Sequence, residues 1–111
     1  MLRIEKTKEE NRDILHLIGE VDASNSVLLD QSIQEVVVQG TSFLLIDGKE
    51  LGYISSAGLG VFMSYLDDFS ERGIRFAIFG LNEQVNEVFK ILGLDRLIAI
   101  APDLSTASRI A

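Results

Sequence analysis

Residues 43–46, Phe-Leu-Leu-Ile, form a run that is apolar on both faces of any strand built from it. Successive side chains of a strand point to opposite faces of its sheet, so this run requires apolar cover on both sides. Helix-like patterns precede and follow it in the chain. The run therefore predicts a central strand in a sheet against which helices pack, which is an α/β architecture.

Further strands are predicted on both sides of this run. Residues 2–7 alternate apolar and polar side chains, and residues 14–18 follow after a polar turn short enough to make a hairpin. Residues 74–79 and 97–100 are short and apolar. We therefore expect a sheet of four or five strands.

Helical spacing predicts about four helices between these strands. The first begins at Ser24 or Ser26, the second follows residues 53–60 without a break, the third begins after Asn82, and a weak fourth spans residues 103–110. Apolar residues at helical spacing form the expected core faces: Leu29, Ile33, Val36 and Val37; Leu59, Phe62, Met63, Leu66 and Phe69; Val85, Val88, Phe89 and Leu92. Because strands alternate with helices, we expect one domain, residues 1–111, with a mixed and mostly parallel sheet.

The composition limits the classes of partner. The 111-residue chain has 17 acidic and 10 basic side chains and a formal net charge of −7. An acidic surface repels phosphate backbones, which argues against nucleic acid and favours a protein partner with a basic patch. There is no cysteine and one histidine, His16, which we expect to be exposed and without a role, and no spacing indicates a metal or cofactor site.

The sequence also predicts where the protein works. Residues 1–13 are charged and lack the apolar core of a signal peptide. No apolar run is long enough to cross a bilayer. We therefore expect a cytoplasmic protein without a membrane span.

Residues 53–60, Tyr-Ile-Ser-Ser-Ala-Gly-Leu-Gly, stand where the second helix begins. Serine is a preferred N-cap because its hydroxyl accepts a hydrogen bond from an amide of the first turn, but one helix needs only one cap. A second hydroxyl there can accept a phosphate, which a helix N-terminus tolerates. The stretch contains no P-loop, no complete dinucleotide-binding fingerprint and no Gly-x-Ser-x-Gly motif, so we expect no enzymatic activity.

Three segments together resemble the STAS domain family of bacterial anti-sigma factor antagonists. Residues 46–66 are similar to the family's central motif, in which a buried strand is followed by Asp-Ser-Ser/Thr-Gly-Leu-Gly at the start of a helix. Residues 17–25 match its Gly-Glu-Leu/Val-Asp segment, and residues 80–100 resemble its third helix and last strand. The resemblance covers nearly the whole chain, and the combination is more specific than any one segment.

The resemblance assigns roles to individual residues. The family's phosphorylated serine lies two positions before the motif glycine, which makes Ser56 the expected phosphorylation site; Ser55, where the family usually has aspartate, is the alternative acceptor. Asp47 matches an aspartate at the end of the strand. The residues expected to contact a partner are Asp22, Ser55, Ser56, Ala57, Gly58 and Leu59.

The function that the resemblance implies is partner switching. The unphosphorylated protein would bind an anti-sigma factor that is also a serine kinase, phosphorylation of Ser56 would end the binding, and a serine phosphatase would restore it. Two alternatives remain open at this point. One is a STAS scaffold or transport-associated subunit that is never phosphorylated, and the other is a sensor that binds a small anion or nucleotide at the helix N-terminus.

Overall fold

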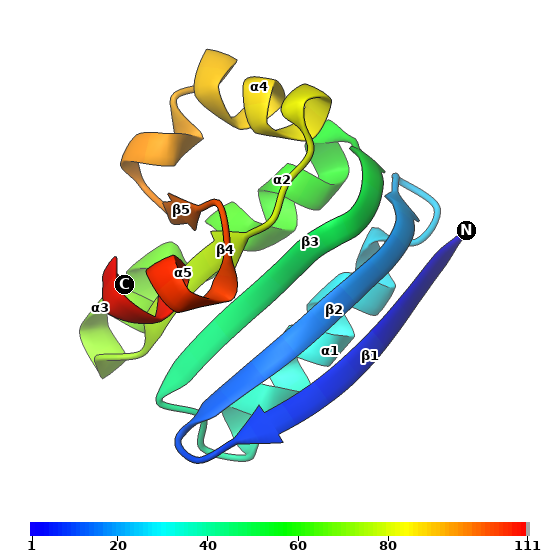
Figure 1. The fold of residues 1–111 in the computed structure, drawn as a ribbon. Coiled ribbons are helices and arrows are strands. Elements are labelled where there is room, and N and C mark those ends of the chain that lie inside the picture. Colours follow the sequence, from blue (N-terminus) through cyan, green and yellow to red (C-terminus); the bar gives the residue numbers. More distant parts are fainter. Residues whose placement is uncertain (111) are drawn as a thin grey trace.

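The computed structural model describes residues 1–110 and contains one five-stranded sheet in the spatial order β1-β2-β3-β4-β5 (Figure 1). β1 is antiparallel to β2, and the other neighbouring strands are parallel. The strands are β1 (Leu2–Glu9), β2 (Arg12–Val21), β3 (Phe43–Ile54), β4 (Arg75–Phe79) and β5 (Ala99–Ala101). The predicted α/β class and the mixed, mostly parallel sheet are therefore confirmed.

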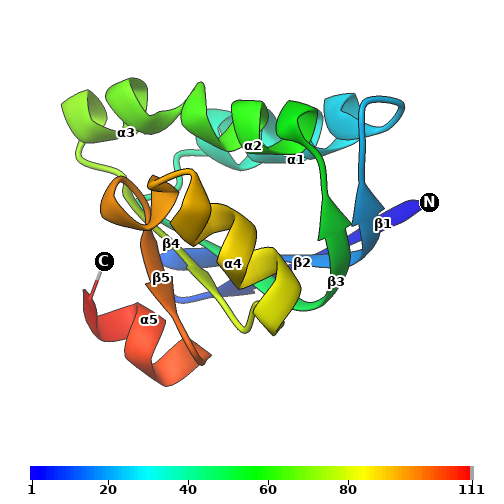
Figure 2. The same cartoon turned by 90° about the horizontal axis from the view of Figure 1, so that it is seen from above.

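Helices cover the two faces of the sheet unequally. They are α1 (Ser26–Val38), α2 (Ser56–Met63), α3 (Leu66–Arg72), α4 (Glu83–Ile91), the 3₁₀ helix η1 (Leu94–Arg96) and α5 (Leu104–Ile110). Figure 2 shows α1, α2 and α3 on one face and α5 on the other. The larger core cluster lies under the first three helices, and a smaller one lies under α5. In Figure 1, no helix stands in front of β1 and β2, so this part of the second face is open.

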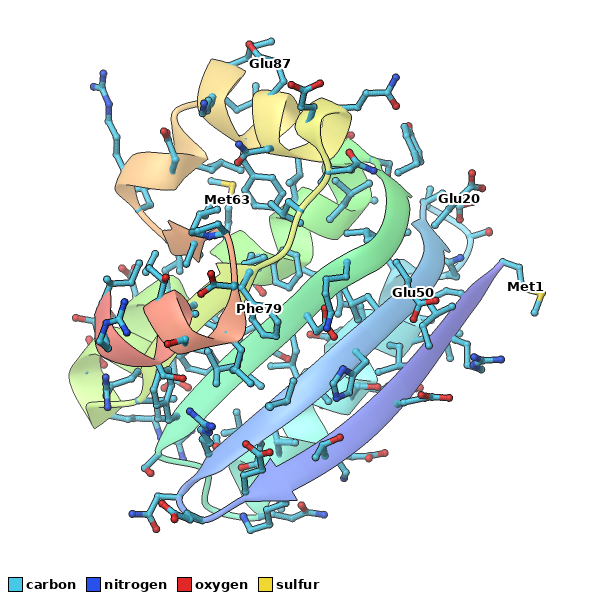
Figure 3. All side chains as sticks on the ribbon, in the orientation of Figure 1. Met1, Glu20, Glu50, Met63, Phe79 and Glu87 are labelled. Carbon is cyan, nitrogen blue, oxygen red and sulfur yellow. The ribbon has the colours of Figure 1, made fainter. Side chains whose placement is uncertain are left out.

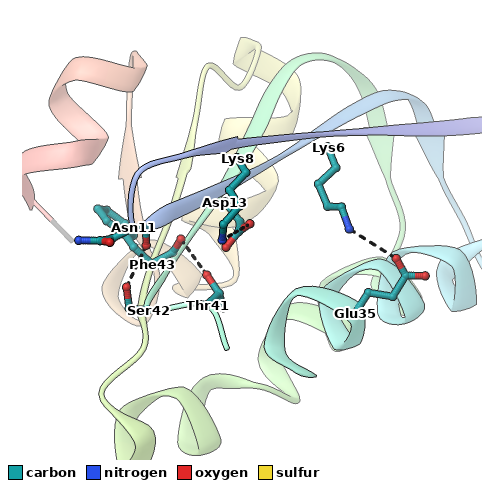
Figure 4. A network of polar contacts seen from close by, with 8 residues as sticks. All are labelled: Lys6, Lys8, Asn11, Asp13, Glu35, Thr41, Ser42 and Phe43. Atoms are coloured by element: carbon teal, nitrogen blue, oxygen red, sulfur yellow. Dashed lines mark hydrogen bonds and ion pairs between the residues drawn. The ribbon is translucent and has the colours of Figure 1, made fainter. Parts of the chain in front are cut away.

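Polar contacts hold the N-terminal hairpin against its neighbours (Figure 4). The Lys6 ammonium lies 3.7 Å from the Glu35 carboxylate of α1, and Lys8 lies 3.5 Å from the buried Asp13. Ser42 donates a hydrogen bond of 2.9 Å to the backbone carbonyl of Asn11 in the β1–β2 turn. The first contact joins β1 to α1, the second joins the two strands of the hairpin, and the third joins the hairpin turn to the residue before β3.

β3 is much longer than the predicted strand at residues 43–46. Its pairing with β2 shifts between His16 and Ile18 and again between Gly19 and Glu20, and each shift inserts an extra residue into β3. A bulge of this kind reverses which face the following side chains occupy. Leu51 therefore points into the larger core cluster against the alternation set by residues 43–46, and the second shift restores that alternation before Ile54, which points into the same cluster.

The second predicted helix was wrong as a continuous element, because it breaks into α2 and α3. The Ser64 hydroxyl donates to the Val61 carbonyl over 2.6 Å, and a hydroxyl that bonds the preceding turn disturbs the helix ladder. The Tyr65 hydroxyl donates to the Asp30 carboxylate on α1, which ties the break to the neighbouring helix. Burial, together with this contact, raises the pKa of Tyr65 above its usual value.

Two predicted helix starts have different outcomes. Asn82 caps α4 as expected, because its side-chain oxygen accepts from the Val85 amide at 2.8 Å. Neither Ser24 nor Ser26 caps α1; the N-cap position is Asn25, whose side chain bonds the preceding loop instead.

Candidate functional site

The two sequence segments expected at the site meet where β2 and β3 end. The Ser55 amide donates a hydrogen bond of 2.8 Å to the Val21 carbonyl, which extends the parallel pairing by one step. Carboxyl ends of parallel strands share one edge of the sheet, and that edge is where such folds place their sites. The contact brings the residue before Asp22 against the start of α2. Among residues 1–110, no hydrogen bond or ion pair joins Asp22 itself to Ser55 or Ser56.

The structure distinguishes the two adjacent serines. Ser55 is extended, with φ −87° and ψ 173°, and its hydroxyl accepts from the Gly58 amide at 3.4 Å, so it is the N-cap of α2. Ser56 is the first helical residue and is exposed. Within the described part of the chain, no hydrogen bond engages its hydroxyl. The cap and the free hydroxyl are thus different residues.

Replacing Ser55 with alanine is expected to lower the free energy of unfolding by about 1 kcal/mol, because the Gly58 amide loses its acceptor. Urea unfolding followed by circular dichroism measures this. Ser70→Ala is the matched control, because Ser70 is exposed within α3 and caps nothing. Equal stability of the two variants would contradict the assignment of Ser55 as the cap.

The next three residues bring α2 close to the sheet. Ala57 is partly buried, and Leu59 is 3% exposed and belongs to the larger core cluster. A Cβ on Gly58 would lie 2.6 Å from Cγ1 of Val21 and 2.7 Å from Cγ1 of Ile54. Only a residue without a side chain allows this approach.

Asp22 organises the loop between β2 and α1. Its carboxylate accepts from the Ser24 hydroxyl at 2.6 Å and from the Ser24 amide at 2.9 Å. These two bonds lower the pKa of Asp22 below its usual value. Asn25 closes the loop by accepting from the Asp22 amide at 2.9 Å and donating to the Glu20 carbonyl at 3.0 Å.

Asp47 lies within β3 and not at its end, so the prediction of a strand-end position was wrong. Its side chain is 9% exposed and accepts a hydrogen bond of 2.7 Å from Nδ1 of His16 on β2. The expectation of an exposed His16 was also wrong, because only 28% of its side chain is exposed. No pattern in the sequence indicated this pair, whose members lie on different strands.

Sequence reasoning also missed an apolar groove beside Ser56. It has a volume of about 270 Å³ and is lined by Ser56, Leu59, Gly60, Met63, Leu92 and Leu94. Met63 and Leu92, both expected in the core, are 46% and 58% exposed. Figure 3 shows Met63 reaching from α2 toward the segment that follows α4. Helical spacing predicted which residues are apolar on one face of each helix. It did not predict that Leu92, at the end of the apolar face of α4, lies exposed in this groove.

Two other kinds of site are absent from residues 1–110. No group of three or more His, Asp or Glu side chains in this range is arranged to hold a metal ion. None of the described helices has the length and apolar character needed to cross a membrane.

Comparison with known proteins gives one consistent family. The model of the STAS domain matches residues 3–107. The anti-sigma-B factor antagonist of Listeria monocytogenes is 30% identical over 95 residues, which cover 84% of this chain and 83% of the relative. That of Bacillus subtilis is 27% identical over 100 residues, covering 90% of this chain and 91% of the relative.

Solved structures agree on the fold. An anti-sigma factor antagonist from Mycobacterium paratuberculosis superposes with a TM-score of 0.89 at 19% identity, covering 97% of this chain and 92% of that one. The anti-sigma factor antagonist SpoIIAA of Bacillus gives a TM-score of 0.78 in its unphosphorylated form and 0.71 in its phosphorylated form, at 17% identity, with at least 96% of each chain covered. With its five-stranded sheet and a family match over nearly its whole length, this chain belongs to the STAS domain family.

Proposed function

We propose that this chain is an anti-sigma factor antagonist and that Ser56 is its phosphorylation switch. The observation that carries the proposal is the free, exposed hydroxyl of Ser56 on the first turn of α2, beside a neighbour that already caps the helix. The names of the relatives from Listeria and Bacillus support the regulatory role. We propose no catalytic activity for the chain itself.

The replacement of the family's usual aspartate by Ser55 is compatible with this role. Aspartate and serine are both preferred N-caps, and the Ser55 hydroxyl accepts the bond that a carboxylate would accept. The replacement removes one negative charge beside Ser56 but keeps the start of α2 in place. Ser56, and not Ser55, therefore remains available as the acceptor.

A phosphate on Ser56 would change binding more than folding. It adds nearly two negative charges at a helix N-terminus, where amide donors and the helix dipole favour an anion. The same charge would stand at the mouth of the apolar groove, where covering it with a partner requires its desolvation. SpoIIAA, which has been solved with and without its phosphate, supports a fold that accepts this modification.

The proposed partner is an anti-sigma factor that is also a serine kinase, and a serine phosphatase reverses its action. The net charge of −7 favours a basic surface on that partner. Glu20 and Glu50, both exposed, stand at the end of the sheet that carries Ser56 (Figure 3). We propose that acidic side chains of this end steer the partner and that the groove receives one of its apolar side chains.

Leu92→Glu is expected to weaken partner binding at least about tenfold, because it puts a charge where an apolar contact forms. Ile91→Glu is the matched control: Ile91 is 74% exposed on the same turn but does not line the groove. The partner is the kinase that phosphorylates this chain, identified in native cells and purified. Its affinity for each variant is measured by calorimetry. Equal losses in the two variants would contradict docking in the groove.

A further inference from the structure

We propose that His16 and Asp47 form a clamp that positions the switch serine by holding the bulged register of β3. The inference rests on the proposed function, because it concerns how Ser56 is presented. It assigns a positioning role to two side chains that lie outside the site and touch neither Ser55 nor Ser56.

One carboxylate makes both contacts of the clamp. Oδ2 of Asp47 accepts from Nδ1 of His16 on the neighbouring strand at 2.7 Å. Oδ1 accepts from the Lys49 amide, two residues further along β3, at 3.0 Å. Hydrogen bonds to a charged acceptor are stronger than neutral ones, and this acceptor is 9% exposed.

The clamp stands at the point where the strand register changes. His16 is paired with Asp47, and the next pair is Ile18 with Glu50, so Leu17 alone faces two residues of β3. The backbone amide of Lys49 is inside this bulge and donates to the Asp47 side chain. The Asp47 carboxylate therefore bonds the bulged segment of β3 with one oxygen and His16 of β2 with the other.

The bulge at Lys49 determines the face that Leu51 occupies, and the second shift, after Leu51, restores the original alternation before Ile54. Without the extra residue, the alternation of residues 43–46 would turn Leu51 away from the core cluster to which it now belongs. β3 then continues to Ile54, and the next two residues are Ser55 and Ser56. A slip at Lys49 would therefore be transmitted along the strand to the start of α2.

His16 is itself held in one orientation. With Nδ1 donating to Asp47, Nε2 accepts from the Thr7 hydroxyl of β1, which lies 2.9 Å away. The Lys49 ammonium lies 3.7 Å from Oδ2 of Asp47, and Glu5 is paired with His16 across the hairpin. All of these groups belong to β1, β2 and β3. By strand alternation, His16 and Asp47 lie on the same face of the sheet as Ile14 and Leu45, which belong to the smaller core cluster.

The test uses three variants of the full chain, and the amides are followed by NMR without any partner. His16→Ala removes the donor to Asp47, and His16→Gln keeps an N–H that can reach Asp47. Thr7→Val removes only the hydrogen bond from the Thr7 hydroxyl to Nε2 of His16. Loss of a charge-assisted hydrogen bond is expected to raise the exchange rate of the Lys49 amide about tenfold in His16→Ala and to shift the amide signals of Ser55 and Ser56. His16→Gln is expected to restore the exchange rate of the Lys49 amide and the signals of Ser55 and Ser56. Thr7→Val is expected to change that exchange rate by no more than about twofold and to leave the Ser55 and Ser56 signals in place.

A second readout is the fraction of each variant that carries a phosphate on Ser56 in native cells. We expect a fall in His16→Ala and recovery in His16→Gln, with melting temperatures that stay close together. Unchanged Ser55 and Ser56 amide signals in His16→Ala would overturn the clamp, whatever the phosphate content. Absence of phosphate from the unmutated chain would instead contradict the proposed function and leave the amide test intact.

Discussion

Ser56→Glu is expected to lose about a hundredfold or more in affinity for the anti-sigma partner while remaining folded. The glutamate sets a permanent charge on the first turn of α2, at the mouth of the groove formed with Met63 and Leu92. Burying an unpaired charge against a partner costs several kcal/mol, whereas a carboxylate in the first turn is favourable for the helix itself. Calorimetric titration with the purified partner measures the loss.

Two controls separate charge from shape at this position. Ser56→Ala is expected to bind like the unmodified chain but to resist phosphorylation, because it keeps the size and removes the acceptor. Ser70→Glu adds the same charge at an exposed position of α3 and is expected to bind normally. If Ser56→Glu and Ser70→Glu bind equally well, the switch does not lie at Ser56.

Gly58→Ala is expected to lower the free energy of unfolding by about 2–3 kcal/mol, the cost of forcing extra volume into a packed interior. The added Cβ would come within 2.7 Å of Val21 and Ile54, which are 0% and 4% exposed. Neither contact involves the free end of a flexible side chain, so the start of α2 must move away from the sheet.

Gly60→Ala is the matched control on the same helix, because a Cβ there would meet nothing within 4 Å. Alanine is the better helix former, so Gly60→Ala is expected to be neutral or up to about 1 kcal/mol more stable. Chemical unfolding of the two variants gives opposite signs under this account. A Gly58→Ala protein as stable as the unmutated chain would show that α2 can shift without cost.

The order of strands and helices could be predicted because, where the core is regular, apolar residues follow the spacing expected of each element. Residues 43–46 are apolar on both faces, and they form the start of a strand that is covered on both sides. Prediction failed where polar side chains bond nearby backbone groups or a neighbouring element. Asp47 bonds the Lys49 amide in the bulge, and Ser64 and Tyr65 make polar contacts at the break between α2 and α3; none of these residues interrupts the apolar pattern in a recognisable way.

The sequence was enough to locate the site, but not to assign separate roles to its two adjacent serines. Local reasoning required one cap and left two serines, and only the backbone conformation shows that Ser55 is the cap and Ser56 is free. The groove depends on residues of α2 meeting the turn after α4, and the pair of His16 and Asp47 joins two strands. Both are tertiary contacts between distant segments, which periodicity and spacing do not encode.

The central claim is that Ser56 carries the switch, and the most direct test is the mass of the protein purified from its native cells. Intact mass is combined with fragment mapping across residues 53–62, in cells sampled during growth, stress and starvation. The account predicts a form heavier by about 80 Da, one phosphate, with the added mass on Ser56. A chain that remains unmodified under all three conditions while still binding its partner would contradict the account.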